Sequence, residues 1–285
     1  MEIYYYQDPI GNFGDDLNAW LWPKLFPSAI QGYFDDDTML VGIGTLLNHK
    51  IPPVPTKKLV FGSGYGYGRP PSINEKWLFY CVRGPLTAEV LGLSEKLAIC
   101  DSALLFRELI EPAQNPGEQI AFMPHHRTSR NDNWKEVCDA LDIQYIDPTG
   151  SIEKIINSIR DSKLVITEAM HGAIIADALR IPWIPVKTRS RILEFKWQDW
   201  ARTLNIKHEF EWLPPAWSND VDKNYQKVFR PITSIYARER LRWLIKHGKR
   251  RLSRDDVLEQ VYERLLEAFN KLLDDATMER NRGMV

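Results

Sequence analysis

The chain has 285 residues, which is enough for one large domain or two ordinary ones. Hydrophobic residues make up 44% and charged residues 26%, an ordinary soluble composition with ample material for a core. The formal net charge of −1 lacks the basic excess of proteins that bind polyanions, so we expect no nucleic-acid partner.

Hydrophobic runs, the first residues and the cysteine spacing indicate the cellular compartment of the protein. No run of about 18 apolar residues occurs, so no transmembrane helix is expected. The first ten residues lack the basic and apolar regions of a signal peptide. Cys81, Cys100 and Cys138 are widely spaced and form no CxxC pair. These features predict a cytoplasmic protein in a reducing compartment, without a disulfide framework or a structural zinc site.

Short β-rich runs alternate with polar or glycine-rich turns and helices over the first hundred residues. The predicted strands are residues 3–6, 39–43, 58–61, 78–82 and 97–100. The predicted helices cover residues 17–25 and a segment that starts near Pro85, whose ring suits the first turn of a helix. This alternation predicts a parallel, doubly wound sheet.

The same pattern restarts after residues 111–119, whose two prolines and glycine predict a linker. Strands are predicted at 120–123, 144–146, 164–167 and 183–186, and helices near 134–141, 152–160, 170–179 and 192–204. From residue 229 onward, two helices and no strand are predicted. We therefore expect an α/β fold of two doubly wound, Rossmann-like domains that face a cleft, with C-terminal helices. The expected units are residues 1–112, 118–228 and 229–285.

His171 is the first candidate functional residue. It follows the buried run at residues 164–167 and opens a helix that Pro182 ends, so it lies at the carboxyl edge of the predicted sheet. Open α/β folds place their ligands at that edge. Two interpretations are open: a core histidine that is hydrogen-bonded to the backbone, and a residue of a functional site.

A second candidate site is the turn "MPHHRTSR" at residues 123–130, which gathers His125, His126, Arg127 and Arg130 after a predicted strand. Packing gives little reason for four potentially cationic groups in one turn. We expect an anion site there. A metal site is disfavoured because no His, Asp or Glu stands nearby at ligand spacing.

Two further basic stretches lie at predicted strand ends. Arg83 comes just before a helix amino terminus, where a guanidinium and free N–H groups form a cradle for phosphate or carboxylate. An ion pair with a local acid is the alternative. Lys187, Arg189 and Arg191 share the sheet edge of His171 and suit either an anion site or a solvated basic turn.

Two further turns contain glycines, which allow the backbone to approach a ligand closely. "GNFGDDLN" at residues 11–18 holds Asn12, Asp15 and Asp16 before a helix. Capping of the helix by one aspartate and binding of a ligand are equal alternatives, and capping by one leaves the other free for a sugar hydroxyl. "GSGYGYG" at residues 62–68 fits no dinucleotide or Walker pattern, so a flexible turn is preferred there.

Four stretches together resemble the polysaccharide pyruvyltransferase family: "GNFGDDLN", "VRGPLTAE", "CDSALL" and "ITEAMHGAIIADALRIPWIPV". The last, together with "PHHR" and "FKWQDW", is most similar to the exopolysaccharide ketal-pyruvate branch, as in succinoglycan synthesis. The resemblance spans residues 1 to about 205. It implies a glycosyltransferase-B-like pair of domains and transfer of the enolpyruvyl unit of phosphoenolpyruvate to a sugar diol. The product is a pyruvate ketal with phosphate released, and no cofactor or metal is implied.

The resemblance also implies roles for particular residues. His171 is the expected acid that protonates the methylene carbon, since histidine suits that task at neutral pH. Glu168 is expected to orient the ring or accept the sugar proton. The expected ligands are Arg83, His125, His126, Arg127 and Arg189 for phosphoenolpyruvate, and Asn12, Asp15 and Asp16 for the acceptor.

One position departs from the family pattern. Many members carry Arg-Leu-His where this chain has Ala169-Met170-His171, so an arginine is absent. His125, Arg127, Arg189 and Arg191 are the candidates to replace it. Two other functions stay open: a glycosyltransferase that uses a nucleotide-sugar donor, and a non-catalytic carbohydrate-binding or assembly protein.

Residues 230–254 carry nine Lys or Arg and one acid, Glu239. On a helix, Ile235, Leu241, Leu244 and Ile245 can share one face, with Trp243 at its border. Such a helix suits peripheral contact with the anionic inner membrane, where a lipid-linked oligosaccharide acceptor is expected. The alternative is a packing helix with a solvated basic face.

Overall fold

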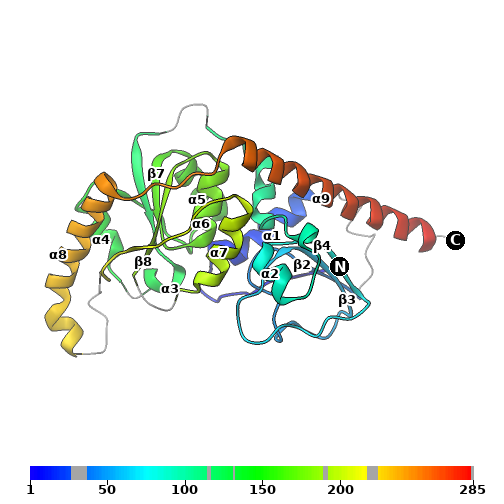
Figure 1. Cartoon of the computed structure of the whole chain (residues 1–285). Helices are drawn as coiled ribbons and strands as arrows, with labels where there is room; N and C mark the ends of the chain where they lie inside the picture. Colours follow the sequence, from blue (N-terminus) through cyan, green and yellow to red (C-terminus); the bar gives the residue numbers. More distant parts are fainter. Residues whose placement is uncertain (27–36, 114–116, 131, 189–191, 217–223, 284–285) are drawn as a thin grey trace.

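The computed structural model describes residues 1–26, 37–113, 117–130, 132–188, 192–216 and 224–283, with only the backbone described for 224–231 and 279–283. Its two halves are each built around a parallel sheet, and they lie side by side (Figure 1). Within the described residues, no helix has a stretch long and apolar enough to cross a lipid bilayer.

The first half contains a four-stranded parallel sheet with the order β1-β2-β3-β4. Strands β2 and β3 are buried almost throughout, as expected where both faces of a parallel sheet are covered. The elements are β1 (Glu2–Tyr4), α1 (Phe13–Leu25), β2 (Thr38–Val41), β3 (Lys57–Ser63), β4 (Trp77–Val82), α2 (Pro85–Val90) and the 3₁₀ helices η2 (Glu95–Leu97) and η3 (Ser102–Glu108).

The second half contains a five-stranded parallel sheet with the order β6-β5-β7-β8-β9. Its strands are β5 (Gln119–Met123), β6 (Gln144–Tyr145), β7 (Ser162–Thr167), β8 (Trp183–Lys187) and β9 (Glu211–Trp212). Its helices are α3 (His126–Ser129), α4 (Trp134–Asp139), α5 (Ile152–Arg160), α6 (Met170–Ala178) and α7 (Glu194–Thr203). The prediction of an α/β fold with parallel sheets is therefore confirmed.

The strand predicted at residues 97–100 is wrong. The Ser94 side chain accepts a hydrogen bond from the Lys96 N–H, which starts η2, and Asp101 caps the start of η3. The residues left between the two turns are too few for a ladder, and Ala98 makes only an isolated bridge to Val82. Strand β9 was not predicted, since two residues are too short to show an alternating pattern.

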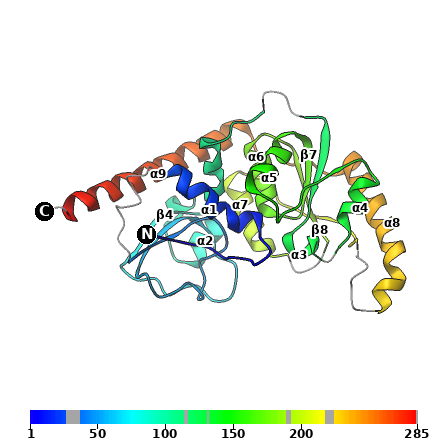
Figure 2. The ribbon, with the colours of Figure 1, turned by 180° about the vertical axis from the view of Figure 1, so that it is seen from behind.

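The two predicted C-terminal helices are present as α8 (Asn224–His247) and α9 (Asp255–Gly283). Helix α8 packs on the second half, whereas α9 runs back along the first half (Figures 1 and 2). The Tyr80 hydroxyl of β4 donates to Asp275 of α9 over 3.1 Å, and Arg107 pairs with Glu259 over 2.8 Å. The chain end thus returns to the half from which it started.

One buried core cluster joins the two halves. It contains Leu17 and Leu21 of α1, Ala173 and Ile174 of α6, and Leu265 of α9. Burial of such side chains contributes about 25 cal/mol per Å² of apolar surface, so the two halves are held together by a substantial apolar contact. This contact also brings the start of α6 against the start of α1, where the candidate functional residues lie.

Candidate active site

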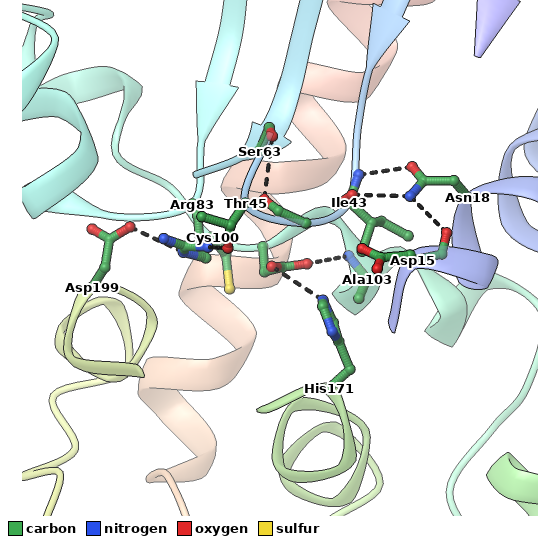
Figure 3. Close-up of polar contacts among 12 residues, drawn as sticks. Asp15, Asn18, Ile43, Thr45, Ser63, Arg83, Cys100, Ala103, His171 and Asp199 are labelled. Atoms are coloured by element: carbon green, nitrogen blue, oxygen red, sulfur yellow. Dashed lines mark hydrogen bonds and ion pairs between the residues drawn. The ribbon is translucent and has the colours of Figure 1, made fainter. Parts of the chain in front are cut away.

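His171 lies where the sequence places it, in the first turn of α6 and directly after β7. Its side chain is 12% exposed and points across to the first half (Figure 3). The Nε2 atom lies 3.6 Å from Oδ2 of Asp101, the residue that caps η3. The alternative of a core histidine bonded to backbone is therefore not what the geometry shows.

Asp101 is fully buried and uses one carboxylate oxygen locally. Its Oδ1 atom accepts the N–H of Ala103 over 3.0 Å. Within the described residues, Oδ2 of Asp101 and Nε2 of His171 are both buried without a hydrogen-bond partner. Buried polar atoms rarely stay unpaired, so these two facing atoms are suited to form a hydrogen bond with each other or with a bound ligand. Asp101 belongs to the sequence motif "CDSALL", but the sequence pattern alone indicates no role for it.

Gly14 makes room for the histidine ring. A Cβ at this position would overlap the Nδ1 and ring carbon atoms of His171. Only a residue without a side chain lets α1 approach the ring this closely. The second glycine of "GNFGDDLN" is thus explained by contact between the two halves.

The first turn of α1 arranges the predicted acceptor residues. Asn12 is the helix cap, so the alternative in which an aspartate caps the helix is wrong. Asp16 instead accepts the Asn12 N–H over 2.8 Å, while the Asn12 side chain donates to Asp15. Burial raises the pKa of Asp15 to about 6, with His171, Asn12 and Lys196 opposing the shift. Asp15 therefore lies within electrostatic range of His171 and Lys196.

Asn18, which is buried, locks this turn to the end of β2. Its amide nitrogen donates to the carbonyl oxygens of Asp15 and Ile43 over 3.0 and 2.9 Å. Its amide oxygen accepts from the Ile43 N–H over 2.9 Å (Figure 3). The same oxygen accepts from the Trp22 indole over 3.0 Å. A buried amide with both ends satisfied fixes the position of Asp15.

Arg83 is fully buried and fixes the two halves together. Its Nε atom pairs with Asp199 of α7 over 3.0 Å, and its other nitrogens donate to Thr45 and to the Tyr65 carbonyl over 2.9 and 2.8 Å. A Cβ at Gly64 would overlap the guanidinium. The expected role in donor binding is not supported by this geometry. The alternative of an ion pair fits, although the acid is distant in sequence rather than local.

Glu168 is also structural. It is buried, and its Oε2 atom accepts the His125 N–H over 3.1 Å. Its Oε1 atom accepts the N–H and hydroxyl of Thr188 over 2.9 and 2.6 Å. The carboxylate thus ties together the loops after β5 and β8. The expected role in orienting His171 is not supported, because Asp101 faces that ring.

The turn of His125, His126 and Arg127 carries less charge than its sequence suggests. Burial lowers the pKa of His125 to about 2 and that of His126 to about 4, with Lys196 and the neighbouring arginines lowering both further. Both rings are therefore neutral at pH 7. The Nδ1 atom of His125 accepts the Arg127 N–H over 3.2 Å, so its Nε2 atom carries the proton. Arg130 pairs with Asp8.

Lys196 is the cation that sequence reasoning missed. It lies in the first turn of α7, within the motif "FKWQDW". The local sequence pattern indicates no role for this lysine. Burial lowers its pKa to about 8; Arg83 and Arg127 lower it further, and Asp15 and Asp101 oppose the shift. The lysine is therefore within electrostatic range of both Asp15 and Asp101, the second of which faces His171.

The remaining residues singled out in the sequence are the basic stretch after β8 and the three cysteines. Lys187 pairs with Glu194 over 2.5 Å, while Arg189 and Arg191 lie outside the described residues. The three cysteines are free and buried. Within the parts of the chain that the structure describes, no group of His, Cys, Asp or Glu residues is arranged to hold a metal ion.

Comparison with known proteins gives two matches. A family model described as "Polysaccharide pyruvyl transferase" matches residues 32–190. The chain is also 42% identical over 217 residues to the "Succinoglycan biosynthesis protein ExoV" of Rhizobium meliloti (strain 1021). That match covers 75% of this chain and 68% of the relative. No solved structure matches the chain.

Proposed function

Because this chain belongs to the polysaccharide pyruvyl transferase family, we propose that it transfers the enolpyruvyl group of phosphoenolpyruvate to a sugar diol of an exopolysaccharide precursor. The product is a cyclic pyruvate ketal, and phosphate is released. The observation that carries this proposal is that His171 faces the Asp101 carboxylate over 3.6 Å where the two halves meet, with Asp15 within electrostatic range. The relative that acts in succinoglycan biosynthesis supports an exopolysaccharide as the acceptor class.

In this mechanism His171 is the general acid. Its imidazolium gives a proton to the methylene carbon of phosphoenolpyruvate, which leaves an oxocarbenium-like centre at the neighbouring carbon. Asp101 stabilises the imidazolium and holds the ring, since its Oδ2 atom faces Nε2.

Asp15 and Asn12 are the proposed residues for the acceptor. One sugar hydroxyl attacks the oxocarbenium carbon and gives its proton to Asp15, a carboxyl group whose pKa of about 6 suits proton transfer near neutral pH. Phosphate then leaves, and the second hydroxyl closes the ketal and returns a proton to His171. The proton held by Asp15 leaves with the released phosphate, so both residues regain their starting states. Asp16 supports this turn through the Asn12 N–H.

Donor binding is assigned to the turn after β5. Arg127, which is exposed, supplies charge, and the neutral rings of His125 and His126 supply hydrogen bonds rather than charge. Arg189 stays a proposed ligand of the donor. Charge-assisted contacts of this kind are roughly twice as strong as neutral ones.

The arrangement of the halves extends this proposal. The two parallel sheets correspond to two Rossmann-like domains in a glycosyltransferase-B-like pair, with residues 1–112 and 118–228 as the units and 229–285 as a helical segment. Two features support it: the separate sheets, and the meeting of α1 and α6 at the ends of their strands. Ligands of open α/β sheets bind at such ends.

Helix α8 is the proposed contact with the membrane surface. The face expected to meet lipid is covered, because Leu241 and Leu244 pack in the core of the second half. Ile235 lies on the opposite, outer face. That outer face carries large apolar residues between 43% and 65% exposed, namely Ile232, Ile235, Tyr236 and Trp243. Exposed basic residues, Arg242 and Lys246, lie on the same stripe and suit the anionic cytoplasmic leaflet.

Turnover with defined substrates tests the proposed function. The protein and a His171→Ala variant are incubated with phosphoenolpyruvate and a panel of lipid-linked oligosaccharides. We expect phosphate release and a mass gain of one pyruvyl unit on one acceptor, with a loss of at least ~10²-fold in the folded variant. Transfer from a nucleotide sugar without consumption of phosphoenolpyruvate would instead establish a glycosyltransferase. No release of phosphate with any acceptor would favour a binding protein.

A further inference from the structure

Lys196 is a cation that makes no hydrogen bond or ion pair with any residue the structure describes. Within the described residues, its ammonium group has no hydrogen bond or ion pair, although it interacts electrostatically with Asp15 and Asp101. A buried or half-buried ammonium group that stays unpaired is costly in the folded protein. Such a group is typical of a position that a ligand completes.

The geometry of α7 sets the direction of this side chain. Residues three apart lie on one face of a helix, so Lys196 shares a face with Asp199. Asp199 points into the first half, where it binds Arg83 over 3.0 Å and the Thr87 N–H over 3.0 Å. The buried rings of Trp197 and Trp200 hold the helix on the second half. Lys196 therefore faces the junction of the halves from a rigid helix.

Two arginines and two carboxyl groups lie within electrostatic reach of Lys196. Arg127 lies within electrostatic reach from the turn after β5, and Arg83 does so from the end of β4. Arg83 is committed to Asp199. The carboxyl groups of Asp15 and Asp101 come from the first half and act on the lysine in the opposite direction. An anion bound between Lys196 and Arg127 would thus lie next to the His171 acid.

We propose that Lys196 binds the phosphate group of the donor and takes the place of the arginine that this chain lacks at Ala169. The proposal rests on the proposed function, because it assigns the phosphate of phosphoenolpyruvate to one side chain. An ammonium group is a compact point charge with three donors, which suits the oxygens of a phosphate. In the transfer reaction the same lysine neutralises the phosphate as the bond between carbon and the bridging oxygen breaks.

Binding measurements with simple probes test this assignment. Calorimetry is used to measure the affinities of inorganic phosphate, phosphoenolpyruvate and pyruvate for the wild type, Lys196→Met and Lys196→Arg. Lys154→Met is the matched control, because Lys154 is exposed on α5. We expect the affinity for phosphate and phosphoenolpyruvate to fall at least ~10-fold in Lys196→Met, the effect of losing one charge-assisted contact. Lys196→Arg recovers part of the loss, and pyruvate binding and the KM for the acceptor stay unchanged.

A second measurement uses the wild-type protein alone. An amine-reactive reagent is applied with and without inorganic phosphate, and modified lysines are mapped by mass spectrometry. We expect phosphate to protect Lys196 and to leave Lys154 reactive. Equal labelling of Lys196 with saturating phosphate, or unchanged phosphate affinity in Lys196→Met, would overturn the assignment. Phosphate binding through Lys196 without turnover of phosphoenolpyruvate would uphold this site and overturn the proposed function.

Discussion

The Nε2 atom of His171 in the second half lies 3.6 Å from the Oδ2 atom of Asp101 in the first half. Within the described residues neither atom has a hydrogen-bond partner. A small approach of the two halves would bring the atoms to hydrogen-bond distance. His171 and Asp101 therefore form a polar contact across the junction of the two halves.

Asp101→Asn tests this relationship. Asparagine keeps an oxygen that can accept the Ala103 N–H, so η3 is expected to stay capped. It removes the negative charge that stabilises the imidazolium of His171. We expect kcat to fall by at least ~10²-fold in steady-state assays of phosphate release, with little change in KM for the donor.

Asp147→Asn is the control for that experiment. Asp147 accepts the Thr149 N–H over 2.9 Å in the same local geometry, but it is exposed and, within the described residues, makes no hydrogen bond or ion pair with His171. Its substitution should leave kcat unchanged. A wild-type kcat in Asp101→Asn would remove Asp101 from the proposed mechanism.

Local pattern explains which parts of the fold could be predicted from the sequence. Helix α5 was predicted at residues 152–160 and runs from Ile152 to Arg160, because its apolar residues recur at helical spacing. The position of His171 at the end of β7 follows from the same local reasoning. The strand at 97–100 failed because two side-chain caps, at Ser94 and Asp101, override the apolar run.

The site itself depended on contacts that local pattern does not encode. Arg83 and Asp199 come from different halves, and nothing near Arg83 in the sequence shows that its partner lies on α7. The charge of His125 was misjudged for a similar reason. Its burial and the nearby charge of Lys196, which together keep the ring neutral, depend on tertiary contacts that a local pattern does not show.

Arg83→Met should act on stability. Loss of the guanidinium leaves the buried carboxylate of Asp199 with Thr87 as its remaining partner. Removal of one member of a buried ion pair costs about 3–5 kcal/mol, so the free energy of unfolding in urea should fall by roughly that amount.

The competing prediction is that Arg83 binds the donor. It requires Arg83→Met to keep the wild-type free energy of unfolding and to lose affinity for phosphoenolpyruvate. The two outcomes are separated by one urea titration and one calorimetric titration. Selective loss of donor affinity would show that the ion pair with Asp199 is not its main role.

Asp15→Asn should stabilise the protein at neutral and higher pH. The pKa of Asp15 is raised to about 6 in the folded protein from an ordinary value of 3.8. Above pH 6 the Asp15 side chain is ionised in both states, and its carboxylate is less stable in the folded protein than in the solvent-exposed unfolded chain. This cost is up to about 3 kcal/mol and disappears as the pH falls toward 3.8. The gain in unfolding free energy should thus be about 1 kcal/mol larger at pH 8 than at pH 5.

Urea titrations at the two pH values measure this gain. Asp142→Asn on the surface is the control, since its positive φ of 55° is one that asparagine tolerates. Its effect should not change between the two pH values. A gain for Asp15→Asn that is larger at pH 5 than at pH 8 would contradict a carboxyl group destabilised by burial. The same variant should lose activity, because the proposed acceptor of the sugar proton is gone.

Helix α8 gives the last prediction, which concerns lipid binding. The protein should pellet with vesicles that contain anionic lipid, and binding should weaken as salt is raised, since each basic residue near such a surface contributes on the order of 1 kcal/mol. Replacement of Lys246, Lys249 and Arg250 by glutamine should reduce binding, as should Trp243→Ser on the exposed stripe. Arg251 is left unchanged because it is buried and bridges to Trp183. Replacement of Lys50, Lys154 and Lys271 by glutamine is the matched control and should leave binding intact. Equal pelleting with neutral vesicles, or none with either kind, would leave α8 as a packing helix with a solvated outer face.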